Sequence, residues 1–351
     1  MILEPGSLGS AIETVQTDRE CSLSKMKISV ILCTYNRARS LAKALESVAL
    51  SKMPESVNWE ILIVDNNSKD QTRVIAEEFC SRYPGRFRYA FEPRPGKSHA
   101  LNSGIRLTDA DVLAFMDDDV EVDPDWLRKL TSTLADKRWS GAGGRILIED
   151  SIPLPPWLET NGRYALAPLA IFDLGPEAGE LKEAPFGTNM AFRKEMFSKH
   201  GDFRTDLGPQ PGSEIRNEDT EFGERLLARG ERFFYEPAAL VRHSVQRERI
   251  RKTYFLTWWY DKARSEVRQE GIPSPTKWYI FGVPLYMFRR LCVWTFRWWF
   301  AFNPGKRFSC KLNVWRIAGV VKECHALSVQ RSRDKNGVSR DIGTSSADLS
   351  K

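Results

Sequence analysis

Short apolar runs alternate with helix-like segments over the first third of the chain. Residues 28–33 (ISVILC) form a continuous β-branched run, typical of a strand buried on both faces of a parallel sheet. Further strands are predicted at 60–65, 87–92 and 111–117, and helices at 40–51, 68–83 and 97–107. These β–α repeats predict a doubly wound α/β sheet with helices on both faces.

Two details of this pattern locate a site and a helix start. In doubly wound sheets, ligands bind beyond the carboxyl ends of the strands, which is where Asp65 and Asp117 stand. Ser68 and Gln71 have the spacing of a capping box, so the helix is expected to begin at Ser68.

The pattern changes after residue 143. Residues 150–185 are rich in Pro and Gly and predict a long irregular excursion. A strand entering a short helix is predicted at 187–195, an amphipathic helix at 217–230, and one or two strands at 232–245. We expect one catalytic domain over 27–250.

The segment that follows is aromatic and apolar. Residues 251–270 look helical, and two apolar runs, 278–288 and 291–302, are separated by Arg289-Arg290. A spanning helix needs about 20 apolar residues, so two shorter Trp-rich runs favour an in-plane or re-entrant interfacial segment. A single pass over 278–302 and a helical subdomain packed on the body remain alternatives.

The charge distribution singles out the same segment. The chain has 351 residues, 42% hydrophobic and 28% charged, a balance that excludes collagen-like, disordered and disulfide-scaffold classes. The net charge is +6, yet residues 251–327 hold 14 Lys and Arg against 4 Asp and Glu, with 7 of the 11 Trp. A basic, Trp-rich segment over 251–327 predicts an anionic membrane surface as partner.

The ends and the cysteines point to a cytoplasmic protein. Residues 1–26 lack the apolar core of a signal peptide, and we expect a disordered leader there and a disordered tail at 328–351. The six Cys form no C-x-x-C pair, so reduced thiols are expected, with no disulfide framework and no zinc site.

An acidic run carries the strongest chemical signal. Asp117, Asp118 and Asp119 directly follow a buried strand, with Glu121, Asp123 and Asp125 close behind. An EF-hand is excluded because Val122 replaces the required Gly and Arg128 the final Glu. No G-x-G-x-x-G or Walker A sequence occurs. Mg²⁺ or Mn²⁺ sharing its ligands with a diphosphate fits best.

Six motifs in order resemble the family 2 glycosyltransferases of the GT-A fold. They are TYNR (34–37), IVDNNS (63–68), GKSHALNSGI (96–105), MDDDV (116–120), GTNMAFR (187–193) and NEDTEF (217–222). The resemblance spans about residues 27–245. It implies a mixed GT-A sheet with a Rossmann-like nucleotide-binding half, followed here by the helical, aromatic-rich segment expected to associate with a membrane.

The resemblance also implies roles for individual residues. Asp219 is the general base and Glu218 positions it; Asp117, Asp119 and His243 bind the metal, Mn²⁺ or Mg²⁺. Asp65 bonds the nucleotide base, usually uracil, although the family more often has a second acid where Asn66 stands. The residues implied at the nucleotide sugar are Thr34, Tyr35, Arg37, Asp65, Arg94, Lys97, Asp117 and Asp118.

Without the family, some of these residues have simpler structural roles. Acids such as Glu218 and Asp219 favour any helix N-terminus, Arg94 and Lys97 suit a helix surface, and His243 suits a buried structural role. His99 is expected to be structural.

We therefore expect a metal-dependent inverting glycosyltransferase that uses a nucleotide-diphosphate sugar, UDP-linked, in glycolipid or cell-surface polysaccharide synthesis. The protein is expected at the cytoplasmic face of a membrane, with a glycan or lipid-linked acceptor and no nucleic-acid partner. The alternatives are a nucleotidyltransferase that makes an activated sugar and a non-enzymatic lipid- or RNA-binding protein that uses the basic segment.

Overall fold

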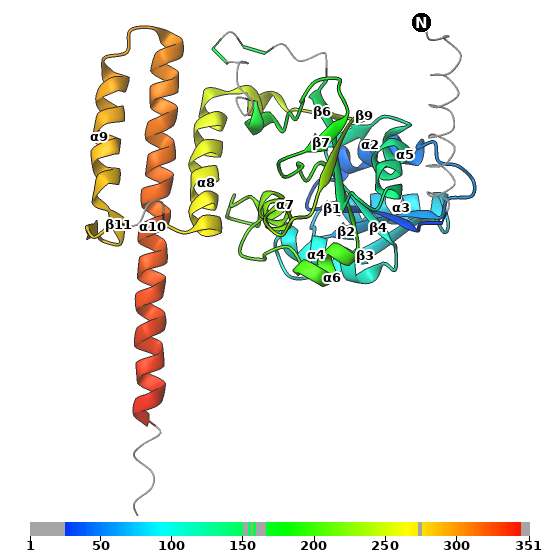
Figure 1. The fold of residues 1–351 in the computed structure, drawn as a ribbon, viewed down its shortest axis with the longest axis horizontal. Helices are drawn as coiled ribbons and strands as arrows, with labels where there is room; N and C mark the ends of the chain where they lie inside the picture. Colours follow the sequence, from blue (N-terminus) through cyan, green and yellow to red (C-terminus); the bar gives the residue numbers. More distant parts are fainter. Residues whose placement is uncertain (1–24, 150–153, 156, 159–165, 273–275, 345–351) are drawn as a thin grey trace, which may run out of the picture. The chain divides into compact units, whose positions relative to one another are not determined.

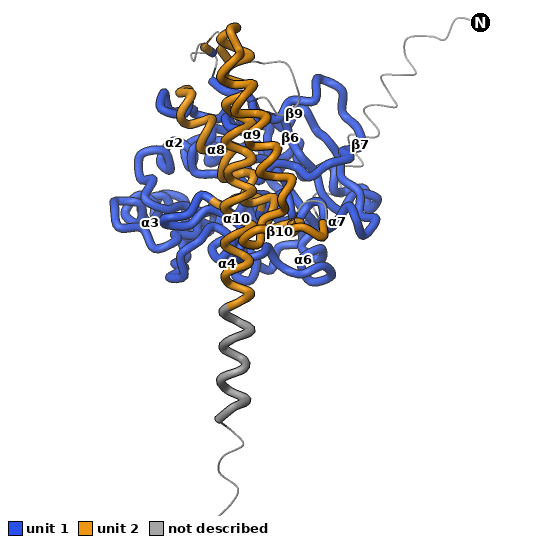
Figure 2. The backbone as a smooth tube through the Cα atoms, turned by 90° about the vertical axis from the view of Figure 1, so that its left-hand side faces the viewer, with its two compact units in different colours: residues 1–154, 162–214, 218–249 blue, residues 155–161, 215–217, 250–351 orange. Residues whose placement is uncertain are grey.

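The computed structural model describes residues 25–149, 154–155, 157–158, 166–272 and 276–344, and the chain divides into two compact units (Figure 2). Unit 1 comprises 1–154, 162–214 and 218–249, and unit 2 comprises 155–161, 215–217 and 250–351. Segments 155–161 and 215–217, which the sequence assigns to the catalytic domain, thus group with unit 2. The expected leader, apart from Lys25 and Met26, lies outside the described residues, as do 345–351.

Unit 1 begins with the predicted parallel strands, and the doubly wound α/β class is confirmed (Figure 1). Strand β1 (Ile28–Thr34) pairs in parallel with β2 (Trp59–Asp65) and β4 (Val112–Asp117), and β2 pairs with β3 (Phe87–Phe91). Helices α2 (Ala38–Ala49), α3 (Thr72–Arg82) and α4 (Lys97–Leu107) connect these strands.

The second half makes the sheet mixed. Strand β8 (Asn189–Arg193) runs antiparallel to β4 and to β6 (Gly141–Ile148), which pairs in parallel with β9 (Phe233–His243). Strands β5 (Val120–Val122) and β7 (Gly179–Leu181) both pair antiparallel with β9. The order β3-β2-β1-β4-β8-β6-β9-β5 brings the ends of β1, β4 and β9 to one region.

Helices cover both faces of this sheet because successive strand residues point to opposite sides. Val30 and Leu32 join the core under α2, α3 and α5 (Trp126–Ser132), while Ile31 joins the core under α4, α6 (Glu195–His200) and α7 (Glu218–Ala228). Three short 3₁₀ helices complete the described elements: η1 (Thr133–Ala135), η2 (Ala167–Leu169) and η3 (Arg247–Ile250).

The predicted capping box at the start of α3 is not formed. The helix begins at Thr72, and the Asp70 carboxylate accepts from the amide of Thr72 at 3.0 Å and from that of Ala38 at 3.1 Å. Ser68 instead accepts from the Asn36 amide at 2.9 Å. Asp70 thus satisfies donors from two helices at once, which the local Ser–Gln spacing could not reveal.

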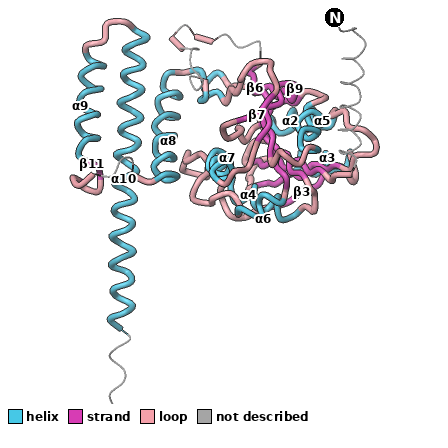
Figure 3. The backbone as a smooth tube through the Cα atoms, viewed as in Figure 1, coloured by secondary structure: helices cyan, strands magenta, loops and turns pink. Residues whose placement is uncertain are grey.

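Unit 2 consists mainly of three helices (Figure 3). Helix α8 (Lys252–Glu270) is followed by the small hairpin β10 (Tyr279–Ile280) and β11 (Val283–Pro284), then by α9 (Leu285–Trp299) and α10 (Pro304–Thr344). Helix α10 packs against both α8 and α9 around a core that includes Val267, Met287, Ile317 and Cys324. The buried Glu323 of α10 pairs with Arg264 of α8 at 2.9 Å.

The structure bears on two predictions for this region, the disordered tail at 328–351 and the membrane segment at 278–302. Helix α10 continues without a break past residue 327, after which the sequence predicts a disordered tail, and reaches Thr344. None of the helices in the described ranges is long and apolar enough to cross a bilayer; residues 278–302 form the hairpin and the 15-residue α9. All five cysteines within the described ranges are free thiols, and Cys21 lies outside them.

Candidate active site

Asp117 ends β4 and is held by donors from two other elements. Lys97 Nζ, at the start of α4, lies 2.7 Å from Asp117 Oδ1, and Thr188 Oγ1 donates to Asp117 Oδ2 at 2.7 Å. Burial opposes ionisation of Asp117, but the Lys97 ammonium outweighs it and lowers the pKa of Asp117. Lys97 Nζ also lies 3.4 Å from Glu218 Oε1. One lysine therefore joins the acidic strand end to the start of α7.

The Asp118 side chain is hydrogen-bonded to the end of β1, whereas Asp117 and Asp119 are paired with basic side chains. Thr34 Oγ1 donates to Asp118 Oδ2 at 2.7 Å, and both side chains are buried. Burial and the neighbouring Asp119 charge raise the pKa of Asp118 to about 7. Near neutral pH, without a bound cation, this acid is thus protonated in a large fraction of molecules.

Asp119 accepts from two guanidinium groups. Arg37 NH1 lies 2.8 Å and Arg249 NH2 3.1 Å from Asp119 Oδ2, while His243 Nε2 lies 3.3 Å from Asp119 Oδ1. Burial alone would raise the pKa of Asp119, but the charges of Arg249 and Arg37 lower it well below its usual range. Asp119 is therefore a fixed negative charge.

His243 reaches Asp119 because the backbone sets their spacing. In the β5–β9 ladder Val120 pairs with His243, and the Ser244 amide donates to the Asp119 carbonyl at 3.1 Å. The ring is 2% exposed, and its Nδ1 lies 2.9 Å from the Leu169 carbonyl oxygen. A carbonyl only accepts, so Nδ1 carries the hydrogen and Nε2 faces Asp119.

This pair has the chemistry of a cation site. Two ligands of one first-row divalent ion stand about 3 Å apart when each is roughly 2.1 Å from the metal at a right angle, close to the 3.3 Å between Asp119 Oδ1 and His243 Nε2. Within the described residues, no three His, Cys, Asp or Glu side chains gather as a metal site. Asp117, the third predicted ligand, is bonded to Lys97 and Thr188 instead.

The predicted base and its neighbour begin α7 and have opposite environments. Asn217, at φ 79°, turns the chain into the helix. Glu218 is buried, and burial raises its pKa. Asp219 is half-buried, and its two carboxylate oxygens accept from the amides of Gly187 at 2.6 Å and Thr220 at 2.7 Å. Asp219 is thus the acid that solvent can reach.

The loops after β1 and β2 are tied to each other. Asn36 and Asn67 both have positive φ, at 51° and 66°, and the Lys69 amide donates to Asn36 Oδ1 at 2.7 Å. Asparagine is one of the few residues that accept this conformation. Tyr35, directly before Asn36, is 40% exposed.

The Asp65 carboxylate is buried and already hydrogen-bonded within the protein. It is 1% exposed, and its oxygens accept from the Ser68 amide at 2.9 Å and from the Tyr89 hydroxyl at 3.0 Å. Asn66, which stands where the family more often has an acid, acts in the loop: the Gly96 amide donates to its Oδ1 at 2.7 Å. Asn66 thereby holds the turn that enters α4.

Arg94 is not brought to the three acids. Its side chain is 56% exposed and pairs with the buried Glu92 at 2.8 Å. The Arg94 hydrogen bond, partly opposed by burial, helps to lower the pKa of Glu92 to about 2. Arg94 therefore forms its own ion pair at the edge of the site.

Three residues of this network received no role from the sequence. Gly187 and Thr188 lie in the GTNMAFR motif, so their place next to Asp219 and Asp117 could have been sought there. Arg249 lies in no motif, and only the fold places it on Asp119 and His243.

Comparison with known proteins finds a family model that covers the motifs from TYNR to GTNMAFR, while NEDTEF lies beyond the matched residues. Residues 29–201 match the family model described as Glycosyl transferase family 2. A glucosyl-dolichyl phosphate glucuronosyltransferase of Haloferax volcanii is 26% identical over 223 residues, 63% of this chain and 70% of that protein. The succinoglycan biosynthesis protein ExoM of Rhizobium meliloti is 26% identical over 225 residues, 64% of this chain and 69% of that protein.

Solved structures share the fold. A mannosyltransferase of Pyrobaculum calidifontis, PcManGT, in complex with GDP-Man and Mn²⁺, superposes with a TM-score of 0.55 at 17% identity, covering 95% of this chain and 89% of that one. GalNAc-T7 with UDP, GalNAc and Mn²⁺ gives 0.51 at 16% identity, covering 78% and 61%. The predicted GT-A fold is confirmed.

Proposed function

We propose that this chain, which belongs to glycosyl transferase family 2, transfers a sugar from a UDP-linked donor to an acceptor hydroxyl with inversion at the anomeric carbon. Family membership supports the coarser statement that the protein transfers sugar in glycan or glycolipid synthesis. The finer proposal rests on one observation: Asp219 is a half-buried carboxylate fixed by the Gly187 and Thr220 amides beside the Lys97 network.

Asp219 is the general base in this proposal. Its carboxylate takes the proton of the acceptor hydroxyl as that oxygen attacks the anomeric carbon. Glu218, buried against Lys97, is a positioning residue. A single in-line displacement needs no side-chain nucleophile, and it inverts the anomeric configuration.

Asp119 and His243 would hold a divalent cation, Mn²⁺ or Mg²⁺, with Asp117 as a further ligand once it leaves Lys97. Such an ion, when bound, supplies positive charge to the departing diphosphate. Two of the solved relatives in fold were crystallised with Mn²⁺. Lys97, freed from Asp117, would then face the diphosphate itself.

The nucleotide lies, in this proposal, over the loops that end β1 and β2. Thr34, Tyr35, Arg37 and Asp118 come from one side of it and Asp65 from the other, with Arg94 at the edge. One of the fold relatives binds GDP-Man and another UDP, so a panel of both kinds of donor tests the base. Because Tyr89 and Ser68 occupy the Asp65 oxygens, uracil recognition by Asp65 requires one of them to give way.

Unit 2 supports a peripheral location on a membrane. On α9, the apolar side chains of Leu285, Val293, Phe296, Trp299 and Phe300 follow helical spacing along one side, each more than 40% exposed. Phe281 before the helix is 79% exposed and Phe302 after it 94%. Isolated exposed apolar residues are common in proteins, but a group of large ones along one side of a helix, here interrupted by Arg289, marks an interaction surface.

The positive charge of the same segment favours an anionic membrane as the binding partner of this surface. Residues 271–322 contain nine Lys and Arg and no Asp or Glu. Arg289, Arg290 and Arg297 are exposed on α9 beside or among the exposed apolar side chains. Aromatic side chains with flanking arginines suit the head-group region of a bilayer. We propose that unit 2 binds the cytoplasmic face of a membrane, where a lipid-linked acceptor is found.

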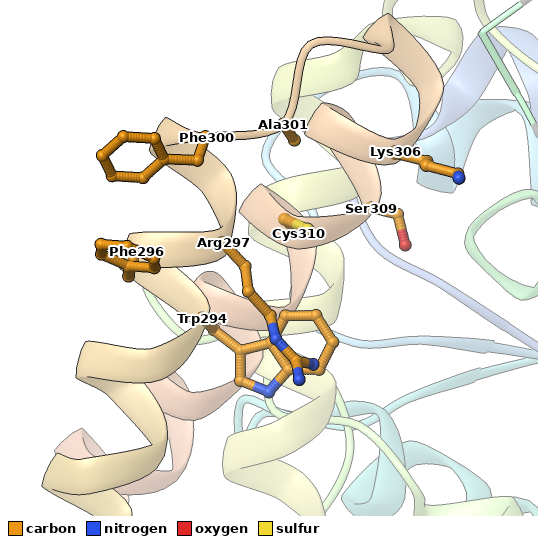
Figure 4. Close-up of a pocket in the computed structure, with 8 residues that line it drawn as sticks. All are labelled: Trp294, Phe296, Arg297, Phe300, Ala301, Lys306, Ser309 and Cys310. Atoms are coloured by element: carbon orange, nitrogen blue, oxygen red, sulfur yellow. The ribbon is translucent and has the colours of Figure 1, made fainter.

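A cavity of about 440 Å³ lies between α9 and α10 on this unit (Figure 4). Phe296 and Phe300 project to the same side of α9, with ring centroids 4.4 Å apart. Arg297 and Lys306 also line the cavity. This combination of rings and cations supports a lipid head group as the local ligand.

The test is a panel of nucleotide sugars, including UDP- and GDP-linked donors, with the full chain and vesicles that carry polyprenyl phosphate or glycolipid acceptors. We expect acceptor-dependent release of one nucleoside diphosphate in the presence of Mn²⁺ or Mg²⁺, and an inverted linkage in the product by NMR. Retention of configuration, or transfer that is unaffected by metal chelation, would contradict the finer proposal.

A further inference from the structure

Arg249 lies where the predicted metal ligands converge. It is in η3, the turn that follows β9, and its side chain is only 20% exposed. Its NH1 is 3.1 Å from His243 Nε2 and its NH2 3.1 Å from Asp119 Oδ2. One planar guanidinium therefore satisfies both groups that would bind a cation.

The hydrogen bonds fix what His243 does in this arrangement. Its Nδ1 donates to the Leu169 carbonyl, and Arg249 can only donate, so Nε2 accepts through its lone pair. A carboxylate oxygen such as Asp119 Oδ1 can likewise only accept, so its 3.3 Å separation from Nε2 is a contact between two acceptors. Two lone pairs directed at one place need a positive group there.

We propose that Arg249 is a resident cation of this site: it occupies the place of the divalent ion in the free protein and must withdraw before the ion can bind. This inference rests on the proposed metal-dependent function. Arg37 on the other side of Asp119 donates to the same carboxylate oxygen but is not bonded to His243, so only Arg249 bridges the pair.

The proposal has a direct energetic consequence. A metal that enters this site displaces two charge-assisted hydrogen bonds and separates a buried ion pair, which lowers its affinity. The turn Arg247–Ile250 that carries Arg249 lies outside β9, separated from its end by residues 244–246, so withdrawal of Arg249 needs no change in the sheet that positions His243. Without the ion, Arg249 supplies a positive charge that compensates part of the negative charge of Asp119.

The test measures Mn²⁺ binding to the full chain without donor, by the electron paramagnetic resonance signal of free Mn²⁺. Arg249→Gln removes the competing charge and keeps much of the side-chain volume. We expect it to tighten Mn²⁺ binding by about tenfold or more. The Mn²⁺ affinity of Arg249→Lys should fall between those of wild type and Arg249→Gln, since a compact ammonium cannot bridge both acceptors.

Arg247→Gln is the matched control. It removes the same charge from the same turn at an exposed side chain, and Mn²⁺ affinity should stay within about twofold of wild type. Thermal unfolding of each variant verifies that the fold is retained. Adding His243→Ala to Arg249→Gln should abolish the gain, because one of the two ligands is lost.

The outcomes separate this inference from the function on which it rests. Equal or weaker Mn²⁺ binding by Arg249→Gln, in a wild type that binds Mn²⁺, overturns the role of Arg249 alone. If neither wild type nor Arg249→Gln binds Mn²⁺, whether nucleoside diphosphate is absent or present, the metal-dependent function fails together with it. Loss of metal-free nucleoside diphosphate binding in Arg249→Gln, with no gain in Mn²⁺ affinity, would instead make Arg249 a permanent substitute for the metal.

Discussion

The backbone amide of Gly187 lies 2.6 Å from a carboxylate oxygen of Asp219. The approach is so close that a Cβ atom at position 187 would stand 2.9 Å from Asp219 Oδ2 and 3.2 Å from Asp219 Cβ. Glycine is therefore required at this position by the carboxylate rather than by backbone conformation, and the segment before β8 sets where the proposed base stands.

Gly187→Ala should consequently slow transfer. The new methyl group displaces the Asp219 carboxylate, and a displacement of about 1 Å can cost on the order of 100-fold in rate. We expect kcat to fall by roughly 10- to 100-fold with little change in donor affinity. Gly179→Ala is the control, because nothing lies within 4 Å of a Cβ there; an equal loss in both variants would disprove the steric cause.

Asp219→Asn tests the base itself. The amide cannot take the acceptor proton, so turnover should drop by about 10²- to 10⁴-fold. Donor binding, measured by calorimetry with the nucleoside diphosphate, should remain near that of wild type. Glu221→Gln, on the same first turn of α7, is the matched control, and near-normal turnover of Asp219→Asn would remove Asp219 from the mechanism.

Chelation of divalent cations should stop transfer, and Mn²⁺ or Mg²⁺ should restore it. His243→Ala should raise the Mn²⁺ concentration needed for half-maximal rate several-fold, because the Nε2 lone pair beside Asp119 is lost. His325→Ala, at an exposed position on α10, should leave that concentration unchanged. A rate that survives exhaustive chelation contradicts this prediction.

Asp118 should make stability depend on pH. Its pKa is raised to about 7 in the folded protein, against about 3.9 in an unfolded chain. The folded state thus binds the proton more tightly, so this group's contribution is present at low pH and is lost as pH rises toward and through 7. Asp118→Asn has no ionisable group at this position, so the variant should not lose this stability as pH rises.

The comparison is therefore the free energy of unfolding of Asp118→Asn minus that of wild type, from urea titrations at pH 5 and pH 8. We expect the difference to favour the variant more at pH 8, by roughly 1–3 kcal/mol. A difference that is constant with pH would show that Asp118 ionises normally.

Phe302→Glu should weaken membrane binding without harming the fold, since the Phe302 side chain is 94% exposed. In sedimentation with anionic vesicles, we expect the partition coefficient to fall by about tenfold or more, the equivalent of one lost Phe. Val74→Glu in α3, at a residue 56% exposed, is the control. Self-association that disappears in Phe302→Glu, without vesicle binding by wild type, would assign this face to a second copy.

The parallel half of the sheet was predictable because β1, β2 and β4 are buried on both faces. A continuous apolar run as short as 28–33 is typical of a buried strand, and β1, β2, β3 and β4 lie within a residue or two of their predicted bounds. The start of α3 was predicted wrongly because Asp70 takes its second partner, the Ala38 amide, from another helix. Contacts between loops of distant sequence leave no local pattern.

The candidate site likewise contains residues that sequence motifs predicted and residues that only the fold brings together. Asp117 and Asp219 were predicted as site residues because they stand in motifs, whereas Gly187 and Thr188, in the GTNMAFR motif, received no predicted role. Arg249 stands in none, and its contact with Asp119 spans 130 residues of sequence. Lys97 was expected at the diphosphate, whereas its ammonium is bonded to Asp117 and near Glu218. Charge pairing of this kind is decided by the assembled sheet.

The register of β5 against β9 bears on how such a site can change in evolution. Since Val120 pairs with His243, the separation of positions 119 and 243 belongs to the backbone ladder and is inherited by any two side chains placed there. Exchanging the imidazole for a carboxylate or an amide would alter which ions are preferred while the strands stay paired. An inserted residue in β9 would instead turn position 243 to the opposite face. Single substitutions at positions 119 and 243 can therefore change which ion is preferred, whereas a one-residue register shift in β9 removes the site.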